Sequence, residues 1–518
     1  GAARSTARNM DASLSVPTAT SVRTVPMKLV IDNRATINNF LRRSRGGKVS
    51  FTHLIAYAMV QAIKSVPAMN AVYAVDEGKP TLVTSSAINV GIAIDVTRAD
   101  GSRQLLVPVI KGCEQLNFAQ FMAAYEALVR KARSGALVVD DFAGATVSIT
   151  NPGGIGTNMS VPRLMSGQAM ILGVGSIDYP PEYQGASDHT VAVQGVSKVC
   201  TLTSTYDHRV IQGAQSGEFL RRIHELLIGA DGFYEDVFEA LRIPYPPYHW
   251  ARDIAANRAD QLDKQARVFG LVQAFRSLGH LQADIDPLEY RIPVHPDLSL
   301  ETHGLTIWDL EREFPVGRFA NGSRRVLTLR EILDVMRDSY CHTLGVEYMH
   351  IDDPVQRAWF QDLFEHPHTP RPREEHLRIL DKLSEAEVFE TFLQTKFVGQ
   401  TRFSLEGAES TIVILAEICE AAAQQQLAEV CIGMPHRGRL NVLTNIAGKL
   451  YSQIFREFDN RVPADDVTTG DVKYHLGVDG EYAAADGRTV AISVAANPSH
   501  LEAVDPVREG IARAKNDR

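Results

Sequence analysis

The stretch TLTSTYDHRVIQGAQSGEFL, from Thr201 to Leu220, contains the transition that decides the fold. A β-prone run ends at Ser204 in the polar cluster Tyr206–Arg209, and apolar residues then recur at helical spacing. The sequence therefore predicts a strand, a tight turn and a helix. A histidine at the end of a strand can project into a crevice, where its near-neutral pKa suits general-base chemistry. A lone histidine is more often structural, so the surrounding sequence has to decide the role of His208.

Short strands and amphipathic helices alternate on both sides of this stretch, over residues 21–241. Helices are predicted at 55–66, 121–129 and 219–227, and strands at 88–94, 105–110, 147–150, 169–174, 191–193 and 199–204. This mixture predicts one α/β domain. Residues 1–20 are rich in Ala, Ser and Thr without periodicity, which predicts a flexible linker.

A proline-rich segment separates this domain from the rest of the chain. RIPYPPYHW has three prolines in nine residues and predicts a linker over 242–252. Residues 253–395 are predominantly helical in pattern. From 396 to 518 the pattern alternates between helices at 412–426 and 439–446 and strands at 430–433 and 489–495. Such alternation favours the start of a parallel α/β sheet with functional residues on loops at strand ends.

The composition excludes several classes of function. The 518 residues carry a net charge of −9, so nucleic acid is a poor candidate partner. The five cysteines show no CxxC spacing, which indicates buried thiols of a reducing compartment and a cytoplasmic location. No run of 18 apolar residues predicts a membrane span. Residues 1–50 hold nine Lys/Arg against two acids, which indicates either a solvated basic loop or a docking surface for an acidic domain or CoA phosphates.

Four separated blocks resemble the acyltransferase (E2) components of 2-oxo-acid dehydrogenase complexes. In chain order they are VPMKLVIDNRATINNFL, KVSFTHLIAYAMVQAIKSVPAMNAVY, VSITNPGGIGT and DHRVIQGA, spread over about residues 22–240. The resemblance implies a chloramphenicol-acetyltransferase-like α/β fold. It also implies an active site formed between subunits, with a trimer as the smallest working unit.

The same resemblance assigns roles to individual residues. His208 would deprotonate the thiol of CoA, and Thr150 would donate a hydrogen bond to the tetrahedral oxyanion. Arg209 and Gln212 would support the site. The succinyl group would arrive on dihydrolipoamide carried by a partner chain, because no Asp-Lys pair of this chain falls on a predicted hairpin tip.

One position departs from the family's DHRxxDG motif. This chain has Gln212 where the family has Asp, and a neutral amide forms hydrogen bonds but no ion pair. Two interpretations follow: an active site with altered support, or a domain retained as an oligomerisation scaffold. Because His208, Arg209, Thr150 and Gly213 are all present, the sequence favours the active site.

Loop residues in the last quarter of the chain form a second candidate site. PHRGR places His436 in a basic turn before a helix, KYHLG contains His475, and NPSH places His500 after a strand. Arg402 lies upstream in KFVGQTRFSLEGAES. Histidines and arginines gathered at strand ends bind carboxylates by charge-assisted hydrogen bonds and bidentate forks. Each residue alone would be an ordinary exposed loop residue, so the prediction depends on their occurring together.

These blocks resemble the thiamine-diphosphate-dependent E1 component of 2-oxoglutarate dehydrogenase. GLVQAFRSLGHLQADIDPL, GLTIWDLEREF and CHTLGVEYMHI extend the resemblance over about residues 253–518. By that resemblance, His436 and His475 recognise the carboxylate and 2-oxo-acid groups of 2-oxoglutarate, with Arg402 and His500 beside them. Thiamine diphosphate and Mg²⁺ are the implied cofactors, and the thiazolium supplies the carbanion chemistry.

The loop that would hold this cofactor is not found in the sequence. Thiamine enzymes use a GDG-type loop and a later Asn, whereas this chain has no GDG tripeptide. No metal ligands are predicted within the chain, and the cofactor-binding residues stay unknown. By the resemblance this loop would follow the block NPSHLEAVDPVREGIARAK, so we expect these residues beyond residue 518. The chain does not begin with Met and its last residues continue a helical pattern, as in a fragment of a longer polypeptide.

An E2-type domain ahead of such an E1 region resembles the actinobacterial 2-oxoglutarate dehydrogenase/decarboxylase hybrids. The implied partners are a lipoyl-bearing E2, dihydrolipoamide dehydrogenase and a small FHA-domain regulator, with dimers through the E1 region and trimers through the E2-type domain. The predicted function is decarboxylation of 2-oxoglutarate in the tricarboxylic acid cycle, coupled to succinyl transfer to CoA. Two alternatives stay open: an inactive first domain that serves as a scaffold, and release of succinic semialdehyde in place of succinyl-CoA.

Overall fold

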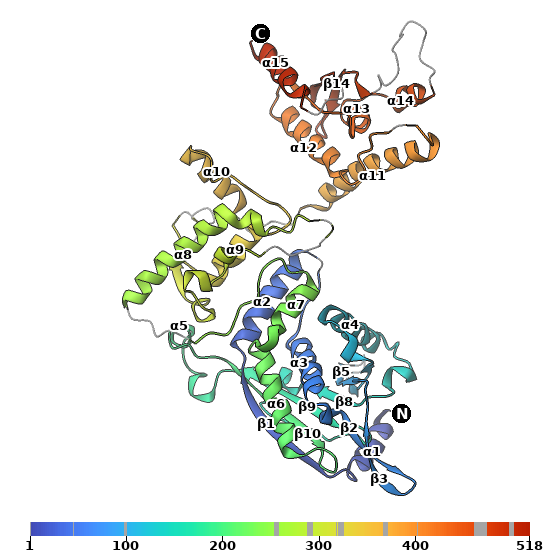
Figure 1. The fold of residues 1–518 in the computed structure, drawn as a ribbon, viewed down its shortest axis with the longest axis vertical. Helices are drawn as coiled ribbons and strands as arrows, with labels where there is room; N and C mark the ends of the chain where they lie inside the picture. The colour runs from blue at the N-terminus through green and yellow to red at the C-terminus, as the bar shows by residue number, and fades with distance from the viewer. Residues whose placement is uncertain are drawn as a thin grey trace. The chain divides into compact units, whose positions relative to one another are not determined.

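The computed structural model describes residues 2–44, 46–97, 101–252, 258–286, 288, 294–317, 319, 326–365, 371–400, 402–459, 474–496 and 502–517. The chain divides into two compact units, Gly1–Pro367 and His368–Arg518, and each is described by itself (Figure 1). The domain boundaries inferred from the sequence remain predictions.

A six-stranded mixed sheet forms the centre of the first unit, with strand order β1-β10-β9-β8-β4-β7. The strands are β1 (Thr18–Pro26), β4 (Val90–Ile92), β7 (Val109–Ile110), β8 (Val147–Thr150), β9 (Met170–Asp178) and β10 (Val199–Asp207). Strand β8 runs parallel to β4 and β9, whereas β10 is antiparallel to β1 and β9. The central strands β8 and β9 are buried over most of their length because both faces are covered.

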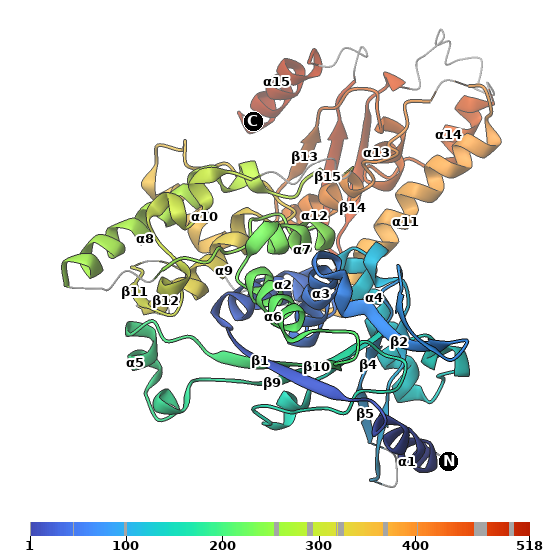
Figure 2. The ribbon, with the colours of Figure 1, turned by 60° about the horizontal axis from the view of Figure 1, so that its bottom comes forward.

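Two long helices, α3 (Phe51–Ser65) and α6 (Gly213–Leu227), lie side by side over one face of this sheet (Figures 1 and 2). The Ser50 hydroxyl accepts the backbone N–H of His53 at 3.2 Å and starts α3. Helices α2 (Lys28–Arg43), α4 (Phe118–Ser134) and α7 (Phe233–Leu241) complete the covering. The apolar stripes that predicted α3, α4 and α6 form the core of this unit.

Three predictions for this region are wrong or incomplete. The strand predicted at 191–193 is the end of helix α5 (Asp188–Val193), which Ser187 caps by accepting the backbone N–H of Thr190. The strand predicted at 105–110 is two strands, β6 (Arg103–Leu106) and β7, because Pro108 between them has no N–H to donate. Residues 1–20, predicted as linker, contain helix α1 (Ala2–Ser13) and the start of β1, which pairs with β10.

The run predicted at 88–94 is likewise divided, into β4 and β5 (Ile94–Thr97). Strand β5 pairs with β6, and β2 (Ala71–Asp76) pairs with β3 (Lys79–Thr84), each as a separate antiparallel hairpin. The six-stranded sheet is therefore flanked by two hairpins that the sequence analysis did not separate.

The helical region that follows the proline-rich segment packs on α2 through charged groups. It contains α8 (Arg258–Leu278), α9 (Leu329–Tyr340), α10 (Pro354–Phe364) and an unpredicted hairpin of β11 (Glu313–Pro315) and β12 (Val326–Thr328). Asp32 of α2 is fully buried and pairs with Arg330 of α9 and with Lys28, the latter at 3.1 Å. Arg43 of α2 pairs with Asp338. Lys28 and Arg43, two cations of the basic stretch, are thus paired with acids inside this unit.

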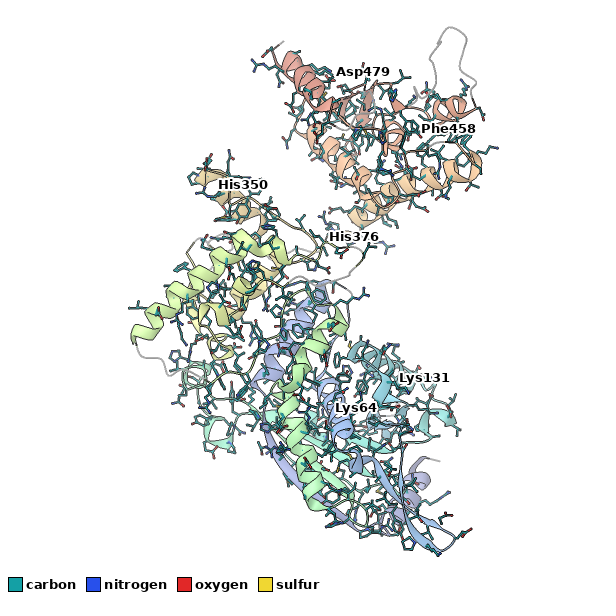
Figure 3. All side chains as sticks on the ribbon, in the orientation of Figure 1. Lys64, Lys131, His350, His376, Phe458 and Asp479 are labelled. Atoms are coloured by element: carbon teal, nitrogen blue, oxygen red, sulfur yellow. The ribbon has the colours of Figure 1, made fainter. Side chains whose placement is uncertain are left out.

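The second unit begins with the long helix α11 (Arg373–Lys396). It continues through α12 (Ser410–Gln424), β13 (Glu429–Ile432), α13 (Arg439–Asn445), α14 (Tyr451–Phe458), β14 (Val478–Ala483), β15 (Thr489–Val494) and α15 (Val504–Asn516). Strands β13 and β15 are parallel, as the alternation predicted, and β14 adds an antiparallel edge that was missed. Phe458 lies at the end of α14 (Figure 3). Its ring stacks on that of Phe397, with ring centroids 4.8 Å apart, and both side chains belong to the hydrophobic core of this unit.

All five cysteines are free thiols, and four of them, Cys113, Cys200, Cys341 and Cys419, are buried, as the sequence predicted. Cys431 is partly exposed. In the part of the chain that the structure describes, no helix combines the length and the apolar character that a bilayer crossing requires.

His249, in the proline-rich segment, contacts two acids from different parts of the first unit. Its Nε2 lies 2.8 Å from Glu235 of α7, and its Nδ1 lies 3.5 Å from Glu301. The hydrogen bond to Glu235, then that to Glu301, raises the pKa of His249 from 6.5 to about 10. Because the folded pKa is the higher one, this contact stabilises the fold fully below pH 6.5, and the contribution disappears as pH rises through about 10.

We expect an NMR titration to find the His249 imidazole still protonated at about pH 8. Glu235→Gln removes the first of the two acceptors and should bring the midpoint back toward the value of a free imidazole. A His249 midpoint near 6.5 in the unmodified protein would contradict this prediction.

Candidate functional site

His208 lies on a tight turn between β10 and α6. The backbone N–H groups of Val210 and Ile211 both donate to the carbonyl of Asp207, at 3.2 and 3.0 Å, and the backbone N–H of His208 donates to Pro17 at 2.9 Å. Ile211 is fully buried and anchors the turn, whereas His208 is exposed. The sequence thus places the imidazole at the surface on a fixed backbone, as the strand–turn–helix pattern predicted.

The hydrogen bond of the imidazole sets its tautomer. Nδ1 of His208 lies 3.1 Å from the carbonyl oxygen of Ile211, and a carbonyl only accepts, so Nδ1 carries the proton. Nε2 is therefore the nitrogen that can accept a proton. The ring of Tyr206 meets the imidazole edge-to-face at 5.6 Å and restricts its rotation. The imidazole is thus held in one tautomer, with Nε2 as its acceptor nitrogen.

An ion pair braces the same turn. The carboxylate of Asp207, which is buried, accepts the backbone N–H of Arg209 at 3.0 Å and its guanidinium at 2.9 and 2.6 Å. The guanidinium carbon also lies 3.8 Å from the ring centroid of Tyr73 on β2. The bond to Asp207 raises the pKa of Arg209. Asp207 and Arg209, the two residues on either side of His208, thus hold each other in place through this ion pair.

Gln212 occupies the position just before α6 and is exposed. Its backbone N–H donates to the side chain of Gln215 at 2.8 Å, which starts the helix. The ion pair beside His208 is made by Asp207 and Arg209, so it exists without an acid at position 212. The family's usual Asp is therefore not needed to hold this turn.

Thr150 is the last residue of β8 and is half buried. The NPGG turn that follows is fixed on two sides. Asn151 donates to the hydroxyl of Thr52 at 2.8 Å, and a Cβ on Gly153 would come within 2.2 Å of the carbonyl of Gly175. Only glycine fits at that close approach, so the turn holds the Thr150 hydroxyl at a defined place at the end of the strand.

The sheet register separates Thr150 from His208 of the same chain. Thr150 pairs with Gly173 of β9, and Gly173 pairs with Thr203 of β10, so these three residues share one row. His208 lies five positions farther along, from 203 to 208. At about 3.3 Å per residue and about 4.8 Å between strands, the two α-carbons are on the order of 15–20 Å apart. Their side chains cannot reach one reacting atom, so a site that uses both needs two copies of the chain.

The second candidate site is built on a stack of rings in the second unit. The ring of Phe403 lies 4.1 Å from the imidazole centroid of His436 and 4.9 Å from the ring of Tyr474. The backbone N–H of Phe403 also approaches the hydroxyl of Tyr474 at 3.4 Å. Because Arg402 and His475 adjoin Phe403 and Tyr474, the structure brings three of the four predicted residues into one neighbourhood. His500 lies outside the described residues.

The turn that carries His436 fits closely against the loop that carries Arg402. Gly438 has φ +75°, its N–H donates to the carbonyl of Phe403 at 2.9 Å, and a Cβ there would meet Leu405 at 2.5 Å. The guanidinium of Arg402 approaches the carbonyl of Glu390 at 3.4 Å, and Nδ1 of His436 is buried with no hydrogen-bond partner among the described residues. A buried polar atom of this kind calls for a hydrogen-bond partner, which the described residues do not supply.

The sequence analysis missed the two rings that join these loops. Phe403 and Tyr474 belong to the quoted blocks TRFSLEG and KYHLG, but an aromatic residue beside a charged one is an ordinary core pattern. Only the distances show that Phe403 contacts both His436 and Tyr474.

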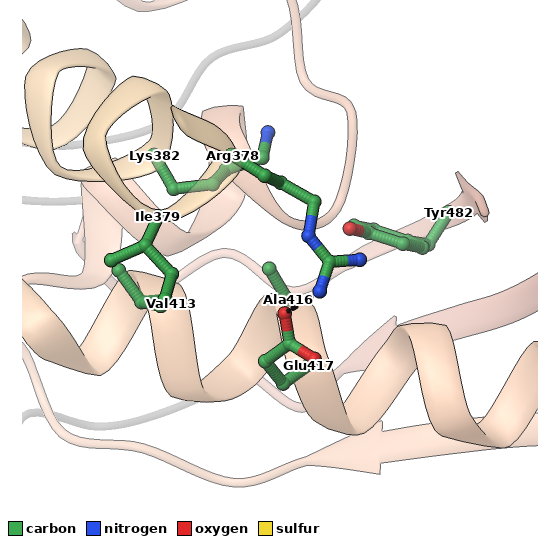
Figure 4. A pocket seen from close by; sticks show the side chains of 7 residues that line it. All are labelled: Arg378, Ile379, Lys382, Val413, Ala416, Glu417 and Tyr482. Atoms are coloured by element: carbon green, nitrogen blue, oxygen red, sulfur yellow. Dashed lines mark hydrogen bonds and ion pairs between the residues drawn. The ribbon is translucent and has the colours of Figure 1, made fainter. Parts of the chain in front are cut away.

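A separate small pocket of the second unit is not a substrate site. It lies between α11, α12 and β14, where the guanidinium of Arg378 reaches Glu417 near the ring of Tyr482 (Figure 4). Its volume of about 10 Å³ is no more than that of a single water molecule.

Comparison with known proteins supports both resemblances. Residues 1–231 match the family model described as 2-oxoacid dehydrogenases acyltransferase (catalytic domain). Residues 1–231 are an acyltransferase domain of the 2-oxoacid dehydrogenase family. Among solved structures, a probable dihydrolipoamide acetyltransferase from Listeria monocytogenes matches 48% of this chain and 96% of its own, with 26% identity and a TM-score of 0.38.

The whole chain is also similar to longer actinobacterial proteins. It is 55% identical to the multifunctional 2-oxoglutarate metabolism enzyme of Mycolicibacterium vanbaalenii and 53% identical to the 2-oxoglutarate dehydrogenase E1/E2 component of Corynebacterium glutamicum, over 100% of its length. It spans 42% of the length of each relative. The predicted relationship to these actinobacterial E1/E2-type proteins is therefore confirmed.

The residues that would hold thiamine diphosphate and Mg²⁺ are not identified in the part of the chain that the structure describes. No three His, Cys, Asp or Glu side chains among the described residues gather closely enough to hold a metal ion, and the sequence has no GDG tripeptide. The described residues near His436 include the cation Arg402, the rings of Phe403 and Tyr474, and the carboxylates of Glu390 and Glu406, the latter 3.9 Å from the Arg402 guanidinium. The chemistry of this cofactor is therefore not assigned to any residue of this chain.

The separation of Thr150 and His208 predicts that the acyltransferase domain works only between copies. His208→Ala and Thr150→Val should each abolish CoA acylation in a homogeneous oligomer. After the two variants are unfolded together and reassembled in equal amounts, one neighbouring pair in four has an intact His208 and an intact Thr150. We expect about a quarter of the wild-type rate if subunits mix at random around a closed ring. No recovery in oligomers shown to be mixed would contradict the shared site.

Proposed function

We propose that the acyltransferase domain transfers a succinyl group from dihydrolipoamide of a partner chain to CoA. The observation that supports this most is the tautomer of His208: Nδ1 donates to Ile211, so Nε2 is an exposed base beside a braced turn. General-base catalysis by a histidine of this kind contributes about 10²–10⁴-fold to such reactions.

The proposed transfer runs through this chain's own side chains. Nε2 of His208 takes the proton of the CoA thiol, and the thiolate attacks the thioester carbonyl of succinyl-dihydrolipoamide. The Thr150 hydroxyl of a neighbouring copy donates a hydrogen bond to the tetrahedral oxyanion. When the intermediate collapses, the C–S bond to dihydrolipoamide breaks, and the leaving thiolate takes the proton back from Nε2. The products are succinyl-CoA and dihydrolipoamide.

The scaffold alternative rests on Gln212, which cannot replace the charge of the family's Asp. The ion pair of Asp207 and Arg209 weakens this alternative, since it holds the turn without that Asp. An inactive domain also has no need of a histidine whose Nδ1 is committed to a carbonyl and whose ring is exposed. We therefore propose the active form.

We also propose that the second unit belongs to the E1 part of the same protein and binds 2-oxoglutarate. His436, His475 and Arg402 would bind and orient its carboxylates, with His500 as a further candidate, because histidine and arginine pair strongly with carboxylate. A monocarboxylic 2-oxo acid would leave these groups unpaired and lose affinity. Thiamine diphosphate would stabilise the carbanion formed when CO₂ leaves.

The proposed partners follow from this division of labour. A lipoyl-bearing E2 would supply dihydrolipoamide, dihydrolipoamide dehydrogenase would reoxidise it, and an FHA-domain protein would regulate the reaction. Trimers through the acyltransferase domain and dimers through the E1 part would form the assembly. Without a lipoyl partner, the same decarboxylation would release succinic semialdehyde, so product analysis with and without that partner distinguishes the two outcomes.

The first proposal is tested by succinyl transfer from synthetic succinyl-dihydrolipoamide to CoA, measured on the full chain. His208→Ala should lower the rate by about 10²–10⁴-fold, since it removes the general base. His189→Ala, on an exposed histidine of α5, is the matched control and should keep the rate. Transfer that survives unchanged in His208→Ala would exclude this histidine as the base, and no transfer in the unaltered chain would support the scaffold instead.

The second proposal is tested on the complete protein loaded with thiamine diphosphate and Mg²⁺. His436→Ala should lower kcat/KM for 2-oxoglutarate by at least about tenfold, because a charged hydrogen bond contributes roughly 1.5–3 kcal/mol. His376→Ala, on an exposed residue of α11 (Figure 3), is the control. An unchanged kcat/KM for His436→Ala would exclude this histidine from the substrate site.

A further inference from the structure

Arg439 is the first residue of α13 and is fully buried. Within the described residues no carboxylate forms an ion pair with it, and burial alone lowers its pKa. Its Nε has no hydrogen-bond partner there either. A buried cation without a counterion is costly, so its other contacts have to account for its presence.

Those contacts are three backbone carbonyls from three different loops. The guanidinium donates to Met434 at 3.3 Å, to Leu476 at 2.7 Å and to Ala495 at 2.7 Å. Each carbonyl lies beside a predicted substrate residue or block. Met434 is two residues before His436, and Leu476 directly follows His475.

The third carbonyl, of Ala495, directly follows β15, at the start of the NPSH block. The backbone N–H of Ala495 in turn donates to Ile432 of β13 at 2.9 Å, so the ends of the two parallel strands are joined at the same place. The planar, multiply donating guanidinium suits such a junction, whereas lysine presents a compact point charge.

We propose that Arg439 is a positioning residue that holds the loops of His436 and His475 at one substrate. This assignment rests on the proposed 2-oxoglutarate site. Arg439 touches no substrate in this account; it sets the distance between two loops that do. Loss of Arg439 should therefore weaken substrate binding more than it slows the chemical step. It should also reduce the energetic coupling between His436 and His475.

The test uses the complete protein with thiamine diphosphate and Mg²⁺. Arg439→Lys keeps the charge but places all its donors on one nitrogen, whereas Arg439 uses Nη1 for Met434 and Nη2 for Leu476 and Ala495. We expect the KM for 2-oxoglutarate to rise by roughly tenfold or more, the loss of about one charged hydrogen bond, with kcat changed much less. Arg488→Lys is the matched control, because Arg488 also donates to a backbone carbonyl, that of Gln424, but on the exposed turn between β14 and β15.

A double-mutant cycle supplies a readout that a purely structural role would not change. In the wild-type background the effects of His436→Ala and His475→Ala should be coupled, and in Arg439→Lys that coupling should shrink. An Arg439→Lys enzyme with unaltered KM and undiminished coupling would overturn the proposal. If His436→Ala leaves kcat/KM for 2-oxoglutarate unchanged, the proposed substrate site is wrong, whatever the result for Arg439→Lys. The failure of the substrate site can therefore be distinguished from the failure of the positioning role.

Folding is checked by circular dichroism and thermal melting. If Arg439→Lys does not fold, Arg439→Gln, which keeps an amide donor, is measured in the same way. Should neither variant fold, Arg439 is a residue that the core requires, and the positioning role is overturned. A folded variant with raised KM and weakened coupling supports it.

Discussion

The register of β10 against β9 and β8 is the constraint on which the first unit's chemistry depends. It places Thr150 in the row of Gly173 and Thr203, while His208 lies beyond the far end of β10. Side chains cannot cross that separation, which is set by the strand spacing and the rise per residue. One copy of the domain therefore holds the His208 imidazole and the Thr150 hydroxyl on separate rigid turns. A second copy is needed to bring these two groups to one substrate.

Rigidity on each side of that divided site comes from short-range contacts. The DHR tripeptide closes on itself through Asp207 and Arg209, and the turn after Thr150 is fixed by glycine packing at Gly153. Neither set of contacts involves the side chain of residue 212. The chain can therefore carry Gln212 and still hold the His208 imidazole in place. In the second unit the corresponding task, holding loops in place, falls to the buried cation Arg439 and to the ring of Phe403.

The sequence predicted the helices and strands that are defined by neighbouring residues, such as a turn that ends a strand or a regular apolar stripe. Strand 147–150 was predicted to the residue, because an apolar run ends at NPGG, and α3, α4 and α6 follow their apolar stripes. Strand β14 was missed because Asp479, Gly480 and Glu481 are poor strand formers and the strand lies at an edge. The strand predicted at 191–193 was wrong because three β-branched or small residues do not outweigh the helix cap at Ser187.

Long-range contacts were beyond the sequence. Asp32 and Arg330 are 298 positions apart, and nothing in either neighbourhood indicates the other. Motif resemblance proposed His208, Thr150, His436 and His475, but it could not show which of them share a neighbourhood in one chain. The structure brings the loops of His436 and His475 together through Phe403 and Tyr474, and it separates Thr150 from His208 by the pairing of strands.

The proposed acyl transfer needs two copies of this chain around one thiol. A cryo-electron microscopy structure of the assembled protein with CoA tests it directly. The account predicts the CoA sulfur within hydrogen-bond reach of Nε2 of His208 from one copy and near the Thr150 hydroxyl of its neighbour. A sulfur held by both residues of one chain, or one remote from His208, would contradict it.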